Sequence, residues 1–457
     1  MRNNLNIQNM KKALLFFVLL LGPLLSKSQV QIRPLPLKGY EQRIIDFIND
    51  MKVVDTHEHL MSPTRLKQRT ALDFMVLLHH YSADDIISSG LPAKLFAKLR
   101  KDSLTVKQKW DILKPYWESS KNTAYNRAAL LAADKLFGIS DINELTVELL
   151  SEKIKKAYQT DWISHVVNDK CKIEYLIQDS DDRSFGTKGF RYVVRFDSFI
   201  FINSKQQITS LGKRQNIDIA NLDDLIKALG SAFNDAKQKG FVAIKSGLAY
   251  NRILNYENTS RGSSAKVFED LMSSPDGTTF TFEDVKPLQD FMMHRVLDLA
   301  RDNKLPVMIH TGLHTGNGNI IENSKPTHLV NLIMEYPTVK FVLMHGSYPY
   351  GAELTTIAKY FPNAYIDMCW LYVISPSYSE RFLHEWIETV PASKIMGFGG
   401  DYLNIENAYS HLLMGKQVVA RVLIDKVKDC YLSESEAKNI ARMILHDNAV
   451  ELFNLSQ

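Results

Sequence analysis

Two histidines one residue apart are the first groups in this sequence that could hold a metal ion. His57 and His59 stand in the segment Val-Val-Asp-Thr-His-Glu-His, which begins at Val53. Alternate side chains of a strand share one face, so both imidazoles can reach one ion if this segment is extended. A His-x-His pair is weak support on its own, and the interpretation therefore depends on further residues.

Three more side chains that can bind metals stand at the ends of apolar segments. His310 ends Pro-Val-Met-Ile-His, His345 ends Phe-Val-Leu-Met-His, and Asp401 follows Ile-Met-Gly-Phe-Gly-Gly. A single histidine of this kind is often a core residue, but barrel enzymes place their chemistry at the carboxyl ends of strands. In a closed barrel the last strand neighbours the first, which would bring Asp401 beside His57 and His59. The joint pattern favours a metal site.

Short apolar segments that alternate with helical patterns predict the scaffold for these side chains. Eight of them have the continuous apolar character of buried parallel strands. They are Lys52–Asp55, Ile173–Gln178, Arg191–Arg195, Phe241–Lys245, Val307–Ile309, Lys340–Met344, Tyr365–Met368 and Lys394–Gly397. Helical patterns fall between them, as in Leu222–Lys239, Val285–Asn303 and Thr327–Tyr336. This order favours an α/β fold of the (β/α)8 TIM-barrel type, with an open doubly wound sheet as the alternative.

One interval is too long for a single connection between neighbouring strands. Residues 56–172 separate the first two predicted strands, and residues 71–167 are rich in helix formers and, from Trp110 onward, in aromatic residues. We expect a helical insertion after the first strand. Loops that follow strands lie at the catalytic end of a barrel, so the insertion should cap the site. The predicted organisation is a barrel over residues 29–457 with a helical cap at about 71–167.

The first 28 residues have the pattern of an export signal. Lys11 and Lys12 precede the apolar stretch Ala13–Leu25, and small and polar residues follow as far as Ser28. This three-part order is typical of a cleaved signal peptide, and the apolar stretch is shorter than the roughly 20 residues that span a bilayer. We therefore predict a signal peptide over residues 1–28 and an exported protein, periplasmic or secreted, with no stable membrane anchor after cleavage.

Composition narrows the class of protein further. Apolar residues make up 45% of the chain and aromatic residues 10%, which argues against disorder, and three cysteines without a CxxC pair cannot form a disulfide framework. The formal charge of +4 is carried by the first 28 residues, which contain four basic and no acidic side chains. A neutral remainder gives no electrostatic case for nucleic acid. We expect a small-molecule substrate, and homo-oligomer formation is left open.

The order of these groups resembles the amidohydrolase superfamily. Members of that superfamily carry a His-x-His pair on the first strand, histidines on the fifth and sixth strands and an aspartate on the eighth. The resemblance extends over nearly the whole chain after the signal. It is strongest to a branch with uronate isomerases, mononuclear decarboxylases and the amidohydrolase-like half of certain glutamine-synthetase fusion proteins. Segments ending at Ser246, Arg252 and Pro349 and the helical stretch Trp110–Gly138 add to it.

This resemblance implies a metal site and a role for each polar side chain. The ligands of one divalent ion, zinc or alternatively manganese or iron, would be His57, His59, His310 and Asp401. Asp401 would also take the proton of a metal-bound water. His345 would polarise the substrate oxygen or transfer a proton, with a core histidine as the alternative.

Substrate contacts are expected from four further residues. Lys245, which ends the fourth predicted strand, leaves three interpretations open: a free ammonium that contacts substrate, a carbamylated bridge between two metals, and a plain surface lysine. We favour the substrate contact and a single metal. Arg195 and Arg252 could bind a substrate carboxylate through their planar guanidinium groups, with a structural ion pair as the alternative for each. His314 lies in a glycine-rich loop and is the fourth candidate contact.

We expect a metal-dependent hydrolase that cleaves an amide, ester or lactone bond of a small acidic molecule through a metal-activated water. Uronate isomerisation or non-oxidative decarboxylation at the same metal is the alternative, because these reactions use the same ligand types. The alternative that is not an enzyme is an exported binding protein that has lost its catalytic activity.

Overall fold

The computed structural model describes residues 39–67, 72–180, 182–185 and 188–456. Contacts divide the chain after Gln42, and Arg43–Gln457 forms one compact unit. The predicted signal peptide, residues 1–28, lies outside the described residues. Among the described helices, none combines the length and the apolar character that crossing a bilayer requires.

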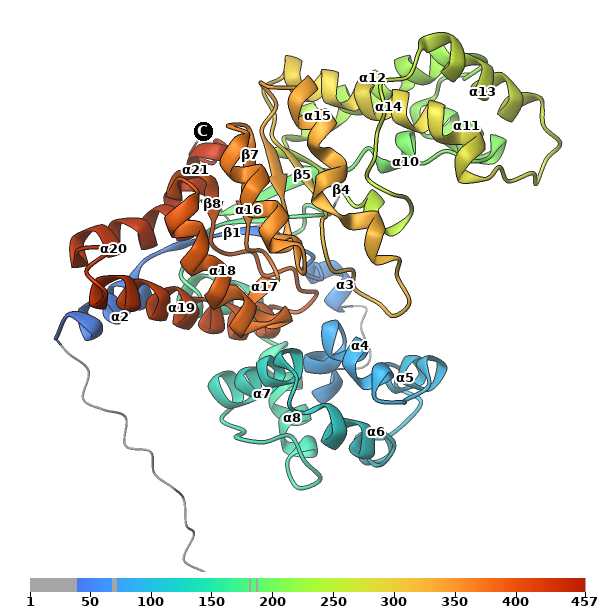
Figure 1. Ribbon diagram of the computed structural model, residues 1–457. Helices are drawn as coiled ribbons and strands as arrows, with labels where there is room; N and C mark the ends of the chain where they lie inside the picture. The colour runs from blue at the N-terminus through green and yellow to red at the C-terminus, as the bar shows by residue number, and fades with distance from the viewer. Residues whose placement is uncertain (1–38, 68–71, 181, 186–187, 457) are drawn as a thin grey trace, which may run out of the picture. The chain divides into compact units, whose positions relative to one another are not determined.

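A sheet of eight parallel strands carries the fold (Figure 1). Each strand pairs with the next one in the chain, from β1 to β8. The strands are β1 (Val53–Glu58), β2 (Ile173–Gln178), β3 (Phe190–Val194), β4 (Ala243–Ser246), β5 (Val307–Ile309), β6 (Phe341–Leu343), β7 (Ala364–Asp367) and β8 (Ile395–Met396). Each lies at one of the eight segments predicted from apolar character; β2 and β5 have the predicted ends, and the ends of the other six differ by one to three residues.

Main-chain hydrogen bonds connect the segment after β8 to β1. The amide of Thr56 donates to the carbonyl of Phe398 at 3.1 Å, and the amide of Asp401 donates to the carbonyl of His57 at 2.8 Å. Because the last segment thereby lies along the first strand, the sheet forms a nearly closed barrel. The predicted (β/α)8 TIM-type fold is confirmed.

Helices follow every strand except β2, after which the next element is β3, and they cover the barrel, so that β4, β5 and β6 are buried at every position. Capping boxes fix where two long helices begin: Asn221 with Asp224 starts one, and Thr281 with Asp284 starts another. The helices after β3 are α10 (Asp197–Ile200), α11 (Lys205–Gln215), α12 (Leu222–Lys239), α13 (Arg261–Ser273), α14 (Phe282–Asp302), α15 (Val330–Glu335), α16 (Gly351–Tyr360), α17 (Leu371–Ile374), α18 (Pro376–Thr389), α19 (Ile405–Lys428), α20 (Glu434–Arg442) and α21 (Asn448–Leu452).

A helical insertion separates β1 from β2, as predicted. Its α-helices are α3 (Pro63–Lys67), α4 (Tyr81–Ser88), α5 (Ala93–Leu99), α6 (Val106–Ser120), α7 (Ala124–Phe137), α8 (Val147–Ala157) and α9 (Trp162–His165), and α2 (Gly39–Asp50) precedes β1. The insertion has an apolar core of its own that includes the fully buried Trp110 and Trp117. The indole of Trp117 donates to the carbonyl of Ile142 at 3.1 Å, which ties α6 to the loop before α8.

Candidate metal site

Every strand of the barrel delivers a polar side chain at or just after its carboxyl end. These residues are His57 and His59 from β1, Asp179 after β2, Arg195 after β3, Lys245 in β4, His310 after β5, His345 after β6, Cys369 after β7 and Asp401 after β8. This end of a barrel is where enzymes with this fold carry out their chemistry.

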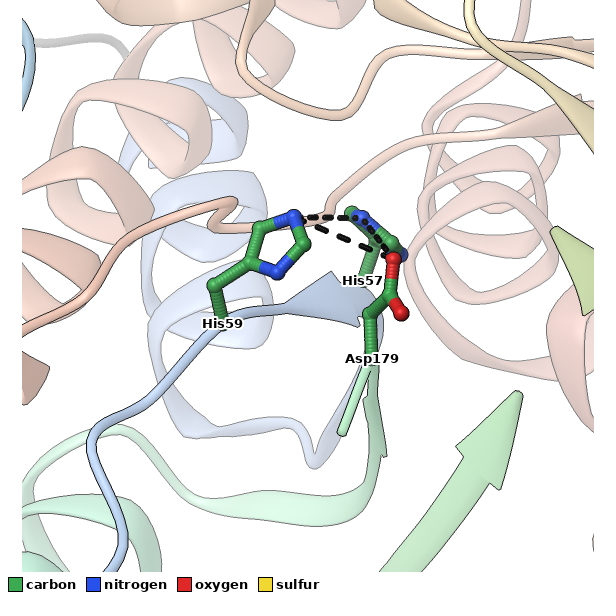
Figure 2. Close-up of side chains that lie close together, drawn as sticks. All are labelled: His57, His59 and Asp179. Carbon is green, nitrogen blue, oxygen red and sulfur yellow. Dashed lines mark hydrogen bonds and ion pairs between the residues drawn. The ribbon is translucent and has the colours of Figure 1, made fainter. Parts of the chain in front are cut away.

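The two histidines of β1 and one carboxylate point toward one another, as Figure 2 shows. His57 Nε2 lies 3.2 Å from His59 Nε2, and Asp179 Oδ2 lies 3.7 Å from the first and 4.0 Å from the second. Four donors around a tetrahedral zinc ion, at bonds of about 2.0–2.1 Å, stand roughly 3.3 Å apart. The donor spacing therefore fits a divalent metal ion held between these side chains.

Asp401, which follows the last strand of the barrel, lies close to the same pair of histidines. Its Oδ1 lies 3.4 Å from His59 Nε2 and 3.8 Å from His57 Nε2. Gly400 permits this approach, because a Cβ at that position would collide with the Glu58 carboxylate. The predicted neighbourhood of Asp401 and the His-x-His pair is thus present in the structure.

Burial sets the protonation of the two histidines. It lowers the pKa of His57 well below its ordinary value, and the neighbouring Lys245 ammonium lowers it further. Burial also lowers the pKa of His59, although the Asp401 and Asp179 carboxylates oppose the shift. Both imidazoles are therefore neutral at pH 7, which is the form that binds a metal.

Asp179 is a site residue that the sequence analysis missed. Arg195 donates to Asp179 Oδ2 from Nε at 2.8 Å and from Nη2 at 2.5 Å. Burial acts to raise the pKa of Asp179, but attraction to Arg195 and His59 outweighs it and holds that pKa below the ordinary value. The sequence feature that could have identified Asp179 is its position directly after the predicted strand Ile173–Gln178. Arg195 keeps 40% of its side chain exposed, and its contact with substrate stays a prediction.

Lys245 lies inside the barrel beside the histidine pair. Its Nζ stands 3.4 Å from His57 Nε2 and donates to Met344 Sδ at 3.0 Å. The residue is 2% exposed, so its interpretation as a plain surface lysine is wrong. Burial lowers the pKa of Lys245, and the positive charge of Arg195 adds to this effect.

His310 and His345 contact each other rather than forming one group with the pair on β1. His310 Nδ1 lies 2.9 Å from His345 Nε2, and His310 Nε2 lies 2.9 Å from the Leu313 carbonyl. His345 Nδ1 faces the Cys369 carbonyl at 3.2 Å and Asp401 Oδ2 at 3.8 Å. His345, Cys369 and Asp401 form a second group with the ligand types of a metal site. The role of His310 as a metal ligand stays a prediction.

Arg252, a predicted substrate contact, lies in a buried ion pair, and its contact with substrate stays a prediction. Its guanidinium is fully buried and donates to Asp290 Oδ1 at 2.6 Å and to Gln289 Oε1 at 3.0 Å, both on α14. A third bond reaches the Asn255 carbonyl at 2.8 Å. The structural ion pair, which was the alternative interpretation of Arg252, is present in the structure.

The insertion contacts the site end of the barrel through α4. The Tyr81 hydroxyl donates to the Asp401 carbonyl at 2.6 Å. One turn further along, Asp84 Oδ2 accepts hydrogen bonds from Thr315 Oγ1 at 3.1 Å and from the Gly316 amide at 2.8 Å. The glycine-rich loop after β5 is therefore bound to the insertion.

His314, a predicted substrate contact, lies in this glycine-rich loop and is buried. Its ring packs against Tyr250 at 4.6 Å and stacks on His310 at 5.3 Å, measured between ring centres. The Tyr250 hydroxyl accepts a hydrogen bond from the Thr315 amide at 3.0 Å. His314 is thus placed beside the site, and its contact with substrate stays a prediction.

Sequence comparisons relate the chain to proteins of known family. Residues 277–455 match the family model described as amidohydrolase. Protein fluG of Emericella nidulans is 29% identical over 225 residues, which are 47% of this chain and 26% of fluG, so the chain spans about a quarter of that relative. The uronate isomerase of Thermotoga maritima is 20% identical over 446 residues, 90% of this chain and 96% of the isomerase.

Solved structures share the fold over nearly the whole chain. A uronate isomerase from Thermotoga maritima superposes with a TM-score of 0.75 at 19% identity and covers 91% of this chain and 97% of its own. A glucuronate isomerase from Caulobacter crescentus gives a TM-score of 0.72 at 15% identity, with 92% and 94% covered. The chain is thus similar to the amidohydrolase family over residues 277–455, and it shares the barrel fold of these isomerases over nearly its whole length.

Proposed function

We propose that this protein isomerises a free uronic acid with the help of one divalent metal ion. In this reaction the aldehyde at C1 becomes a hydroxymethyl group while the hydroxyl at C2 becomes a ketone. The observation that carries the proposal is the likeness to uronate isomerases over about nine tenths of the chain, 90% in sequence and 91% in structure. The hydrolysis predicted as the main function has weaker support, because these full-length relatives are isomerases.

The donor set fits a metal with nitrogen and oxygen ligands. His57, His59 and Asp401 would hold it, since their donor atoms lie 3.2–3.8 Å apart and both imidazoles are neutral. A metal bound there would act as a Lewis acid on the oxygen atoms of the substrate.

The charges around these donors favour an acidic substrate. Lys245 and Arg195 supply two positive charges, and Asp179 and Asp401 supply two negative ones. A divalent cation would leave the site with an excess of positive charge in a largely buried environment. A carboxylate on the substrate would offset this excess, which is why a uronic acid suits the site better than a neutral sugar.

Isomerisation also needs a group that moves a proton between adjacent carbons. Asp401 Oδ1 faces the histidine pair, at 3.4 Å from His59 Nε2. The other carboxylate oxygen, Oδ2, lies 3.8 Å from His345 Nδ1. Burial raises the pKa of Asp401, while His59 and Lys245 act against the shift. We assign to Asp401 Oδ2 the removal of the proton from C2 and its return at C1.

A panel of substrates tests this function. The zinc- or manganese-loaded protein should convert glucuronate or galacturonate into a keto acid, and it should leave glucose, which lacks the carboxylate, unchanged. The double variant His57→Ala, His59→Ala should lose both the metal and the conversion while its circular dichroism stays that of the native protein. Hydrolysis of lactones or dipeptides without any uronate conversion would contradict the proposal.

A further inference from the structure

Basic side chains gather at the amino-terminal end of the barrel, opposite to the strand ends that carry the metal site. A lysine stands one to four positions before each of the five consecutive strands β1 to β5, and Arg191 lies within β3. Because neighbouring parallel strands begin at the same edge of a sheet, these side chains follow one edge of the barrel. We call them the basic band, which consists of Lys52, Lys172, Lys188, Arg191, Lys239 and Lys304.

Two hollows lie along the basic band and meet at Arg191. The first has a volume of about 690 Å³ and is lined by four residues of the band and by the acidic Asp50 and Glu174. The second, of about 670 Å³, is lined by Arg191, Lys239 and Lys304, and none of the other described residues that line it is charged. Together the two hollows extend past the starts of five neighbouring strands.

The acidic residues leave most of this charge uncompensated. Lys52 Nζ lies 3.4 Å from Glu174 Oε1, and Lys172 Nζ lies 2.6 Å from Asp50 Oδ1. For the other four members of the band, no further carboxylate stands among the described residues that line the two hollows. After the predicted signal peptide the chain has 51 basic residues, 55 less the four in residues 1–28, and 51 acidic ones. The excess at this end of the barrel is therefore local, and it gives the surface there a positive potential.

Arg191, where the two hollows meet, is held by neutral groups. Its Nη2 donates to the Leu455 carbonyl at 2.9 Å, and its Nη1 donates to the carbonyls of Phe190 at 3.2 Å and Lys188 at 3.3 Å. Its guanidinium carbon lies 5.0 Å from the centre of the Tyr175 ring. None of these partner groups carries a negative charge, so the guanidinium is fixed in place while its charge stays available to an anion.

We propose that the basic band binds an acidic oligosaccharide, a chain of linked uronic acids. Neighbouring strands of a sheet lie about 4.8 Å apart, so five strand starts span roughly 19 Å, which is enough for several sugar rings in line. Each ring of such a chain carries one carboxylate, which suits a row of separate positive charges. Tyr175, which lines the first hollow, adds an aromatic ring that combines an apolar face with a polar tip.

The choice of a uronate chain rests on the proposed function, while the binding of an anion rests on the band itself. Hydrolysis of the glycosidic bonds of such a chain consumes one water molecule per bond and releases the free uronic acids that the protein would isomerise. Binding at the band would keep the protein beside this source of substrate. The metal site, at the opposite end of the barrel, would stay accessible to the released sugars.

Titration calorimetry of the zinc-loaded full chain with hexagalacturonate tests the proposal. The variant Lys239→Glu, Lys304→Glu reverses two exposed charges of the second hollow, and Lys94→Glu, Lys101→Glu, at exposed positions of the insertion, is the control with the same net charge. A surface charge contact is worth up to about fivefold in affinity, so we expect the first variant to bind at least about tenfold more weakly than the native protein and the control to stay within about twofold. Equal affinities of the two variants would overturn the proposal.

Two other ligands decide which anion the band recognises. Hexagalacturonate with methyl-esterified carboxylates keeps the sugar rings without the charges, and it should bind at least about tenfold more weakly; an equal affinity would contradict the role of charge. A DNA duplex that binds as tightly as hexagalacturonate at the same salt concentration would overturn the assignment to a saccharide. Native circular dichroism of both variants would show that a lost affinity does not come from unfolding. Uronate conversion plays no part in these measurements, so the proposed function can fail while the binding holds, and the reverse.

Discussion

Tyr81 of the insertion donates its hydroxyl hydrogen to the main-chain carbonyl of Asp401 at 2.6 Å. The Tyr81 ring also stacks on Trp370, with 4.2 Å between ring centres. Helix α4 therefore begins directly against the segments that follow β7 and β8. Because the insertion contacts the Asp401 carbonyl, we expect changes in it to affect how substrate enters and leaves.

Loosening the contact between the insertion and the glycine-rich loop should open the site. In Asp84→Ala, Thr315 Oγ1 and the Gly316 amide lose their common acceptor. We expect faster hydrogen exchange over residues 312–319 and a KM for uronate several-fold above that of the native protein, with unchanged zinc content. Asp111→Ala, at an exposed position of α6, is the control. Equal exchange rates in the two variants would show that Asp84 does not hold the loop.

Lys245→Met should separate metal binding from substrate binding. The variant removes the ammonium beside His57, and we expect its zinc content to stay near one per chain. KM for uronate should rise at least about tenfold, or about 1.4 kcal/mol, the order expected for one lost hydrogen bond to a charged group. Two metals in the native protein, with one lost in Lys245→Met, would instead establish the carbamylated bridge.

Arg252 should contribute to stability rather than to activity. Arg252→Met leaves Asp290 buried with Lys286 as its remaining cationic partner. Removing one member of a buried pair costs about 3–5 kcal/mol, and the remaining lysine places the expected loss near about 3 kcal/mol in urea unfolding. Arg261→Met breaks an exposed pair with Asp223 and should leave the unfolding midpoint unchanged. A stable Arg252→Met variant with impaired substrate binding would support the predicted role.

Acid should destabilise the fold partly through His411. Burial lowers the pKa of His411 to about 3, although its hydrogen bond to the Gly400 carbonyl acts in the opposite direction. The unfolded chain takes up this proton near pH 6.5, so the stability is complete above that pH and is lost as pH falls toward 3. The slope is up to about 1.4 kcal/mol per pH unit. Urea unfolding of His411→Gln should depend less on pH in this range, and an unchanged dependence would contradict the assignment.

The scaffold could be predicted from the sequence because buried parallel strands have a strong local signal. Leu222–Lys239 was predicted with the bounds that the helix has, and Val307–Ile309 with those of the strand. The neighbourhood of Asp401 and the His-x-His pair followed from barrel closure, since a closed sheet brings its last strand to its first.

Partners of charged side chains could not be predicted in the same way. The sequence does not distinguish Arg252 from Arg195. In the structure Arg252 forms an ion pair with Asp290 on α14, whereas Arg195 forms one with Asp179 in the site. Only the packing of helices on the barrel decides between them. Asp179 follows the second predicted strand, but only the histidines and the aspartate after the fifth, sixth and eighth strands were considered as residues at strand ends.

The fate of uniformly carbon-13-labelled glucuronate, followed by NMR with the zinc-loaded protein, decides whether the protein isomerises uronic acids. Isomerisation should move the C1 signal from the anomeric region to that of a hydroxymethyl group, give a ketone signal at C2 and retain the carboxylate carbon. Release of labelled bicarbonate, or an unchanged spectrum from protein that contains its metal, would contradict it.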